Sequence, residues 1–442
     1  MDMETSPLLT DLYELTMLRT YRDQGMDGTA VFEFFVRDAG PRRPFFVSAG
    51  IESALDWLVQ ARFGEAECQW LRECGHFDDA FIDAMAHWHF SGTVRAMREG
   101  TIAFPNEPIL QVIAPLPEAQ LVESRLMNIL HGQTLFASKA IRCRLAAGSH
   151  MLVDFGLRRA HGGEAGMWAA RSCYLAGFDA TATCLAGARY GVPVNGTMAH
   201  SFILAHEDER QAFLNFARSY PNNAVFLIDT YDVEKGAKHV VEIAPQLHHE
   251  GIPVKGVRID SGDLASHARR VRTILDQADL TETRILVSGG LDEDRIAALV
   301  ADGAPIDGFG VGSRVDTSDD VPYLDCAYKL HEYDGRAVHK RSEKKNDLPG
   351  RKQVFRHYSG NAMNGDIIGV DGEALSGEAL LVTRISNGER VDQAEPVRTA
   401  RSRCEAQLQH LPAGLQRLQP AERYSVTHSS SLQALLESDG GS

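Results

Sequence analysis

Between residues 150 and 313 the chain repeats one pattern: a short apolar or β-branched run ends in glycine or aspartate, and a helical segment follows. The runs begin near residues 151, 192, 224, 254, 284 and 307. After the first, their starts are separated by roughly 30 residues, the length of a βα unit. Such units bury parallel strands between helices, which restricts the region to an open sheet or a barrel. Six clear units favour an irregular, incomplete α/β barrel.

The segments on either side of this region mix helices and strands. Apolar spacing predicts a helix from about residue 8 and another over 51–63, and the alternating run at 29–37 predicts a strand. Between 92 and 120, short β-like runs are broken by prolines, which would confine them to sheet edges or turns. The end of the chain is β-rich with a polar tail. We expect an N-terminal sandwich part at 1–125, the barrel with the active site at 126–325, and a C-terminal part at 326–442 that packs with the first.

The cysteines and the N-terminal residues indicate the cellular location of the protein. Seven cysteines are an odd number and form no CxxC pair, which fits neither a disulfide framework nor a zinc site. The first residues include Asp2, Glu4 and Asp11, unlike a signal peptide, and no apolar run approaches about 18 residues. We expect reduced thiols, a cytoplasmic location and no membrane partner.

The charge balance limits the possible partners. The chain has 60 acidic and 45 basic residues, a formal net charge of -15, so most of its surface would repel a polyanion. Nucleic acid is therefore not expected as a partner. A small phosphorylated substrate remains possible if a cleft gathers arginines or lysines locally.

Polar residues and glycines stand at the predicted strand ends, and the carboxyl ends of the strands of a barrel meet at one mouth. These residues are therefore expected to form one site. They are Asp154, Phe155 and Arg158; Gly196, Thr197 and His200; Asp229 and Asp232; Arg258, Asp260 and Asp263; Gly289 and Gly290; and Gly310, Gly312, Ser313 and Arg314.

Their chemical types indicate phosphate binding. Glycine-rich turns at 288–290 and 308–313 let backbone N–H groups approach phosphate oxygens, and the helix that follows offers its positive end. Arg258 and Arg314 could bind phosphate through paired hydrogen bonds. Asp260 and Asp263 could hold ribose hydroxyls or Mg²⁺, although Asp263 could instead cap the helix that begins at Leu264.

His200 is the candidate for covalent chemistry. Most of the 17 histidines must be surface or core residues, but His200 follows a predicted strand and a glycine in GTMAHSF. A neutral imidazole beside a bound triphosphate can act as a nucleophile and form a phosphohistidine that stores part of the free energy of ATP.

Seven motifs, in order and in spacing, resemble the nicotinate phosphoribosyltransferase family from about Leu8 to about Arg356. The motifs are TDLYELTM at 10–17, DFGLRRAHG at 154–162, GVPVNGTMAHSF at 191–202, LIDTYD at 227–232, GVRIDSGDL at 256–264, VSGGLDEDRI at 287–296 and FGVGSR at 309–314. The resemblance implies an irregular barrel of the type II phosphoribosyltransferase kind on an α/β sandwich domain. It also implies a homodimer with a shared active site, which joins nicotinate to the ribose of phosphoribosyl pyrophosphate with ATP as co-substrate and Mg²⁺ as cofactor.

The resemblance also implies a role for individual residues. His200 would be phosphorylated by ATP, and Tyr13, from the other subunit, would sandwich the pyridine ring with Phe155. The remaining substrate contacts would come from Arg158, Thr181, Thr197, Arg258, Asp260, Gly289, Gly290, Gly312, Ser313 and Arg314. A basic loop would contribute Lys340, Ser342 and Lys352 to ATP or pyrophosphate, and Asp260 and Asp263 would hold the metal.

Rival functions remain open at this stage. Related nicotinamide enzymes carry an aspartate where this chain has Ala182, and its absence favours an acid substrate, although Asp179 is close in sequence. Nicotinate-using relatives commonly have asparagine where this chain has Thr183. The alternatives are a nicotinamide or quinolinate phosphoribosyltransferase on the same fold, an aldolase or isomerase on a phosphate-binding barrel, and a silent sensor. An aldolase would need a lysine at a strand end, and Lys255 is expected to point outward.

Overall fold

The computed structural model describes residues 2–38, 40, 42–342, 345–419 and 422–438. The chain divides into two compact units, one formed by residues 1–138 with 321–442 and the other by residues 139–320. The division falls within helix α6 (Glu123–Ala147), whereas the sequence-based boundary preceded that helix. No helix in the described ranges is long and apolar enough to cross a membrane.

The first unit is built on a wholly antiparallel sheet of seven strands, in the order β13-β12-β1-β5-β3-β19-β20. Its central strand β1 (Thr29–Asp38) is buried over most of its length because β12 and β5 pair with it on either side, both antiparallel. Since β12 and β19 come from the C-terminal part of the chain, that part completes the N-terminal sheet.

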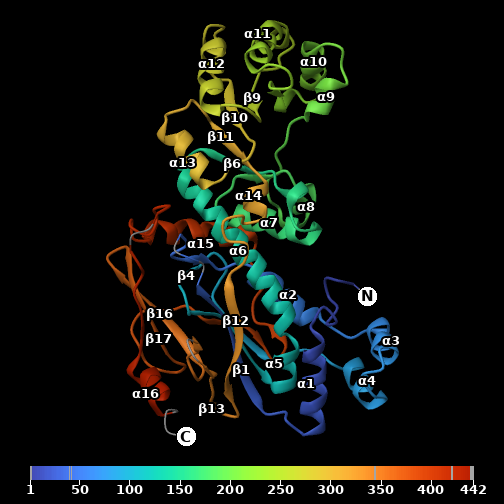
Figure 1. Ribbon diagram of the computed structural model, residues 1–442, viewed down its shortest axis with the longest axis vertical. Coiled ribbons are helices and arrows are strands. Elements are labelled where there is room, and N and C mark those ends of the chain that lie inside the picture. The colour runs from blue at the N-terminus through green and yellow to red at the C-terminus, as the bar shows by residue number, and fades with distance from the viewer. Residues whose placement is uncertain (1, 39, 41, 343–344, 420–421, 439–442) are drawn as a thin grey trace. The chain divides into compact units, whose positions relative to one another are not determined.

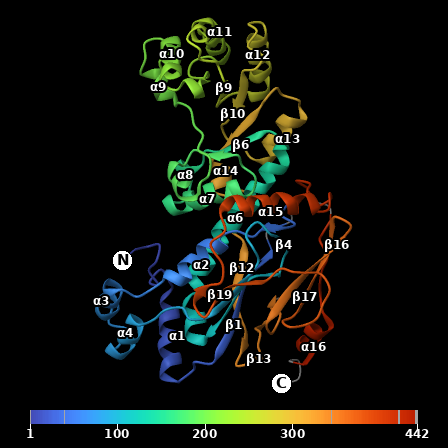
Figure 2. The ribbon, with the colours of Figure 1, turned by 180° about the vertical axis from the view of Figure 1, so that it is seen from behind.

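The other elements of this unit surround the sheet, and β16, β17 and α16 lie together in both ribbon views (Figures 1 and 2). Its helices are α1 (Leu12–Asp23), α2 (Ile51–Gln60), α3 (Glu65–Glu73), α4 (Asp79–Ala86), α5 (Leu116–Leu121), α15 (Val397–His410) and α16 (Ser430–Ser438). Its further strands are β2 (Phe46–Val47), β3 (Thr93–Ala96), β4 (Ile102–Ala103), β5 (Pro108–Pro115), β12 (Asp325–Tyr333), β13 (Arg336–Ala337), β14 (Arg341–Ser342), β15 (Lys345–Asn346), β16 (Lys352–Ser359), β17 (Ala362–Val370), β18 (Glu378–Ala379), β19 (Val382–Ser386), β20 (Glu389–Arg390) and β21 (Val426–His428).

The expectation that prolines confine the runs between 92 and 120 to edges or turns is wrong for β5. This strand is interior, paired with β1 on one side and β3 on the other. Pro108 and Pro115 are its first and last residues. A proline there removes a hydrogen-bond donor at the end of the ladder rather than in its middle.

The second unit is an open, wholly parallel sheet of six strands in the order β7-β6-β11-β10-β9-β8. It is a half-barrel, which confirms the incomplete barrel. The strands are β6 (Met151–Asp154), β7 (Ala180–Thr181), β8 (Val225–Leu227), β9 (Gly256–Ile259), β10 (Arg284–Val287) and β11 (Gly308–Val311).

Helices connect these strands, and α11 lies between α10 and α12 (Figures 1 and 2). Apolar residues of α12 face the sheet, with Leu264, Ala268, Val271 and Leu275 buried as their spacing predicts. The helices are α7 (Gly163–Leu175), α8 (Cys184–Tyr190), α9 (His200–Leu204), α10 (Glu209–Ser219), α11 (Val233–His249), α12 (Leu264–Asp276), α13 (Glu293–Ala301) and α14 (Ser313–Asp316), with 3₁₀ turns at Leu157–Arg159 and Pro221–Asn223.

One predicted strand is replaced by another. The run at 192–196 forms only a bridge between Thr181 and Val194, whereas Ala180–Thr181 is the strand β7 at the sheet edge. Thr181 donates its N–H to Pro193 O at 3.0 Å and accepts from Asn195 N–H at 2.9 Å. The segment therefore still follows the sheet edge and delivers residues 196–200 to the strand ends.

Candidate active site

A cavity of about 760 Å³ opens at the carboxyl ends of the parallel strands, within the size range of small-ligand sites. Twelve of the predicted site residues line it. They are Phe155, Arg158, Gly196, Thr197, His200, Arg258, Asp260, Gly289, Gly290, Gly310, Gly312 and Ser313. The remaining lining residues are Arg159, Ala182, Met198, Ala199, Ser288 and Leu291. Turns that follow β6, β9, β10 and β11 thus contribute to one cavity, the convergence that the sequence predicted.

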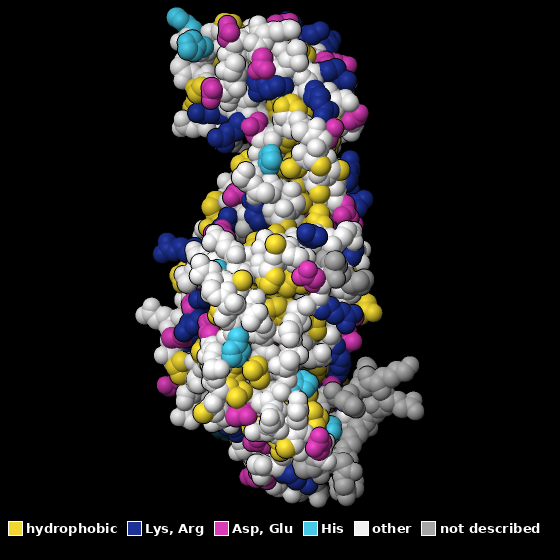
Figure 3. Space-filling model, turned by 90° about the vertical axis from the view of Figure 1, so that its left-hand side faces the viewer, with side chains coloured by type: hydrophobic (Ala, Val, Ile, Leu, Met, Phe, Trp, Pro, Cys, Tyr) yellow, Lys and Arg dark blue, Asp and Glu magenta, His cyan; other side chains and the backbone are white. Residues whose placement is uncertain are grey.

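The cavity wall is cationic although the whole chain is acidic. Its charged side chains are three arginines, Arg158, Arg159 and Arg258, and one carboxylate, Asp260. The outer surface is different: on the face drawn in Figure 3, acidic and basic side chains are interspersed. The local cluster of arginines needed for a small phosphorylated substrate is therefore present in the cavity.

Arg258, on β9, holds several strand ends together. Its guanidinium donates to Met198 O at 2.8 Å and to Ser288 Oγ at 3.2 Å, and lies 3.4 Å from Asp260 Oδ1. It also lies over the ring of Phe155, 5.9 Å from the ring centre. Burial lowers the pKa of Arg258, and the nearby carboxylates of Asp260 and Asp229 oppose that shift. A guanidinium remains charged despite such a shift, so this is a buried cation in the cavity wall.

His200 is the first residue of α9, and its side chain is half-exposed toward the cavity. Nδ1 lies 3.1 Å from Thr230 Oγ1, and Nε2 lies 4.0 Å from the buried carboxylate of Asp229. Asp229 accepts hydrogen bonds from Asp260 N–H and Ser261 Oγ. The imidazole is thus oriented by a hydroxyl and a carboxylate, an arrangement that suits a nucleophile.

Two glycines make room for the site. Gly289 has φ +95°, and a Cβ there would lie 2.0 Å from the carbonyl oxygen of Asp260. A Cβ on Gly310 would lie 2.4 Å from the ring of Phe155, so the missing side chain allows that ring to fit against β11. The turn after β10 and the position of Phe155 therefore both depend on glycine.

We expect Gly289→Ala to lower kcat/KM by about 100-fold or more, because the turn must shift away from Asp260 and a 1 Å displacement at a site has that effect. Gly303→Ala is the matched control, since Gly303 also has positive φ (+63°) but open space around its Cβ. Both variants carry backbone strain, and only the first disturbs the cavity. Steady-state kinetics and melting temperatures of both proteins check this, and equal activity losses would contradict it.

Six predicted residues of this unit do not line the cavity: Asp154, Thr181, Asp229, Asp232, Asp263 and Arg314. Asp232 caps α11, where its carboxylate accepts from Lys235 N–H at 2.8 Å. The carboxylate of Asp263 caps α12, accepting from Ser266 N–H at 3.2 Å and Ser266 Oγ at 2.7 Å, as the cap interpretation has it, and the metal role for Asp263 stays a prediction. The hydroxyl of Thr181 is buried and donates to Asp154 at 2.6 Å. Arg314 lies 2.5 Å from Asp292 Oδ2 and 3.4 Å from Asp319 Oδ2.

Four of the predicted site residues belong to the first unit: Tyr13, Lys340, Ser342 and Lys352. Tyr13 on α1 is about half-exposed, and burial together with Glu14 raises the pKa of its phenol, which stays neutral. Lys340 is exposed, and Ser342 belongs to β14, with its side chain outside the described part. Lys352 is buried at the start of β16, where its ammonium lies 2.8 Å from Glu33 and donates to Leu348 O and Gly350 O. All three donors of this ammonium serve the fold in this structure, and its contact with ATP stays a prediction.

Arg159 and Ser288 line the cavity but were not among the predicted site residues. Both had a signal in the sequence, since Arg159 follows Arg158 in an exposed turn and Ser288 precedes the glycine pair.

Among the residues that the structure describes, no group of three or more His, Cys, Asp or Glu side chains could hold a metal ion. Mg²⁺ commonly binds one or two carboxylates plus substrate phosphates, and Asp260, whose side chain is partly exposed, fits that arrangement.

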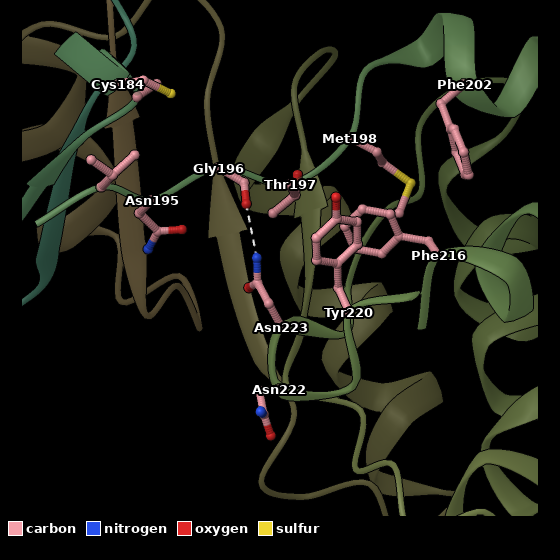
Figure 4. Close-up of a pocket in the computed structure, with 12 residues that line it drawn as sticks. Cys184, Asn195, Gly196, Thr197, Met198, Phe202, Phe216, Tyr220, Asn222 and Asn223 are labelled. Atoms are coloured by element: carbon pink, nitrogen blue, oxygen red, sulfur yellow. Dashed lines mark hydrogen bonds between the residues drawn. The ribbon is translucent and has the colours of Figure 1, made fainter. Parts of the chain in front are cut away.

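A second cavity of about 880 Å³, whose lining side chains are drawn in Figure 4, shares Ala182 and residues 196–198 with the first. Asn223 donates to the carbonyl oxygen of Gly196 at 2.9 Å, drawn as the dashed line in Figure 4, and so fixes this shared segment. Phe202, Phe216 and Tyr220 line it, together with three asparagines and no charged side chain among its lining residues. The cationic cavity is therefore the better phosphate site.

Fold and cavity together define a class of protein: an α/β half-barrel with a cationic cavity, suited to a small phosphorylated ligand, at the carboxyl ends of its parallel strands. A family model described as the nicotinate phosphoribosyltransferase family matches residues 150–362, and models of the N-terminal and C-terminal domains of that enzyme match residues 8–131 and 373–436. The chain belongs to the nicotinate phosphoribosyltransferase family.

Individual relatives agree with this assignment. A nicotinate phosphoribosyltransferase of Mycobacterium tuberculosis is 46% identical over 413 residues, which are 93% of this chain and 89% of that protein. The nicotinate phosphoribosyltransferase of Bacillus subtilis is 38% identical over 385 residues, 85% of this chain and 78% of its own length. The crystal structure of human nicotinic acid phosphoribosyltransferase has a TM-score of 0.87 to this structure at 28% identity, covering 97% of this chain and 99% of the human one.

Proposed function

We propose that this protein converts nicotinate, phosphoribosyl pyrophosphate, ATP and water to nicotinate mononucleotide, pyrophosphate, ADP and phosphate, a step of NAD biosynthesis. Membership of the family supports the phosphoribosyl transfer. The observation that carries the proposal is the single cavity in which three arginines, two glycine turns and His200 meet. The ATP coupling rests on His200.

In the phosphoribosyl transfer, the protein contributes mainly electrostatic stabilisation rather than covalent catalysis. Breaking the bond from ribose C1 to pyrophosphate passes through an oxocarbenium-like state, in which negative charge grows on the leaving group. Arg158 and Arg258 can stabilise that charge, and backbone N–H groups at Gly289–Gly290 and Gly312–Ser313 can hold the 5-phosphate. When bound at Asp260, Mg²⁺ would supply further electrostatic stabilisation of pyrophosphate.

The pyridine ring is held by stacking. Phe155 lines the cavity, and its ring is fixed between Gly310 and the guanidinium of Arg258. Tyr13 of a second copy of this chain would cover the other face of the ring, which makes the working enzyme a homodimer with a shared site. The half-exposed Tyr13 side chain is compatible with that contact.

Preference for an acid follows from the residues near Ala182. Ala182 lines the cavity and offers no carboxylate to accept an amide N–H. Asp179, the other candidate for that role, accepts from Leu152 N–H at 2.8 Å and lies 3.6 Å from Arg144, and it is not among the lining residues of the cavity. Nicotinate is therefore favoured over nicotinamide.

The residues that line the cavity also give no support to the aldolase alternative. Lys255 is exposed, and no lysine is among the residues that line the cavity.

The direct test incubates the protein with labelled nicotinate, phosphoribosyl pyrophosphate and Mg²⁺, with and without ATP, and with nicotinamide or quinolinate in place of nicotinate. Labelled nicotinate mononucleotide, formed faster with ATP, is expected. Faster conversion of nicotinamide or quinolinate would contradict the proposal.

Subunit complementation tests the shared site. A pure dimer of Tyr13→Ala and a pure dimer of Arg258→Ala are each expected to be nearly inactive. In each of these dimers, both active sites lack the substituted side chain. If Tyr13 acts on the partner's site, a heterodimer of the two variants has one intact site. A mixture allowed to exchange subunits would then recover about a quarter of wild-type activity. No recovery in a mixture shown to contain heterodimers would place Tyr13 in its own subunit's site or outside any site.

A further inference from the structure

Two carboxyl groups are buried together beneath the cavity. Asp154 is the last residue of β6, Asp316 is the last of α14, and both side chains are fully buried. Asp154 is well supplied with donors, since it accepts from Thr181 Oγ1 at 2.6 Å and Gly156 N–H at 2.8 Å. Asp316 differs, because neither of its carboxyl oxygens has a hydrogen-bond donor among the described residues, and the carboxyl group that acts on it is that of Asp154.

The Asp316 carboxyl also lies against the backbone that follows Asp154. A Cβ built on Gly156 would lie 2.0 Å from Asp316 Cγ, so only glycine leaves space for it. Two ionised carboxylates in contact and out of water would repel each other strongly. A contact between two carboxyl oxygens becomes a hydrogen bond only if one of them carries a proton.

We propose that Asp316 is a protonated acid that donates its proton to Asp154 in a hydrogen bond, and that this bond positions the two walls of the cavity. One wall is the Phe155–Arg158 segment, and the other is the Gly312–Ser313 turn. The assignment of these walls to substrate rests on the proposed function. Asp316 is a positioning residue, since it does not line the cavity itself.

The backbone shows how the bond reaches both walls. Phe155 follows Asp154 directly and donates its N–H to Val311 O at 2.8 Å. Asp316 donates its own N–H to Gly312 O at 3.2 Å. The acid–carboxylate bond therefore ties the segment carrying the pyridine-stacking ring to the turn that would hold the 5-phosphate.

The electrostatics agree with the geometry. Burial, and after it the charge of Asp154, raises the pKa of Asp316 to about 10. Cys173 of α7 is influenced by both aspartates, and burial keeps this thiol protonated by raising its pKa. A neutral acid at Asp316 leaves one fewer negative charge beneath a cavity built for anions.

The test compares Asp316→Asn with Asp316→Ala in the full-length protein. Asparagine is neutral and can donate an amide N–H to Asp154, so kcat/KM for phosphoribosyl pyrophosphate should stay within about threefold of wild type. Alanine removes the donor and leaves Asp154 facing a void, and the misplaced walls should lower kcat/KM by about 100-fold. Asparagine as damaging as alanine would overturn the donor role.

Infrared spectroscopy provides a readout that needs no activity. At about pH 8, the spectrum of the wild type minus that of Asp316→Asn should contain the carbonyl band of one protonated carboxylic acid. A difference spectrum that shows only a lost ionised carboxylate would overturn the proposal even if Asp316→Ala does not fold. Because this band does not depend on turnover, failure of the proposed enzyme activity would be seen separately, as wild-type protein that makes no nicotinate mononucleotide.

Discussion

His200→Ala is expected to abolish the stimulation of nicotinate mononucleotide synthesis by ATP, and ATP hydrolysis with it, while slow ATP-independent synthesis remains. In the proposed reaction the imidazole is the nucleophile for the γ-phosphate, so its loss would remove the coupling step but leave the arginines and glycine turns of the cavity in place for phosphoribosyl pyrophosphate. The ratio of rates with and without ATP should therefore fall to about one.

The measurement combines steady-state rates with labelling. Wild-type protein incubated with γ-labelled ATP should carry an acid-labile phosphate, and His200→Ala should carry none. His249→Ala is the matched control, since His249 is exposed on α11 and does not line the cavity. Equal stimulation by ATP in His200→Ala and wild type would refute the phosphohistidine.

Arg258→Ala should lower kcat/KM by about 1000-fold, the loss typical of removing one aligned donor from a developing anion. The effect is large because the same guanidinium holds Met198, contacts Ser288 and lies over Phe155, so its removal disturbs both positioning and charge. Arg258→Lys keeps the positive charge but loses the planar set of N–H donors of the guanidinium. Its activity should therefore lie between that of Arg258→Ala and that of the wild type.

Kinetics of the two Arg258 variants should be compared with Arg269→Ala, a control in which a surface arginine paired with Asp302 is removed. The control should leave kcat/KM unchanged within about twofold. A loss smaller than about tenfold in Arg258→Ala would mean that this arginine is structural and that leaving-group charge is stabilised elsewhere.

The parallel sheet and most of its candidate ligand-binding edge could be predicted from the sequence, because β6, β9, β10 and β11 end in or are followed by residues that line the cavity. Arg258 and Gly289 are examples, since a β-branched run followed by aspartate or glycine places them at the mouth by topology alone. The strand expected at 192–196 was wrong for a local reason. Pro193 lacks an N–H, and the neighbouring Ala180–Thr181 takes the edge of the sheet instead.

What sequence could not show is the contact between distant segments. A lysine beside a basic loop suggests a phosphate ligand, but Lys352 is buried against Glu33 of β1, a pairing set by the sheet rather than by any motif. Asp263 illustrates the same limit, because a carboxylate before a helix can cap it or bind a metal, and only coordinates distinguish the two. The contact between Asp154 and Asp316 likewise joins residues that no local pattern connects.

The most direct test of the account is a crystal structure of the protein with nicotinate mononucleotide bound. We predict that its phosphate contacts the turns at Gly289–Gly290 and Gly312–Ser313, and that its pyridine ring stacks on Phe155. Nucleotide bound instead in the uncharged cavity beside Tyr220 and Asn222, or with its ring away from Phe155, would contradict the assignment of the active site.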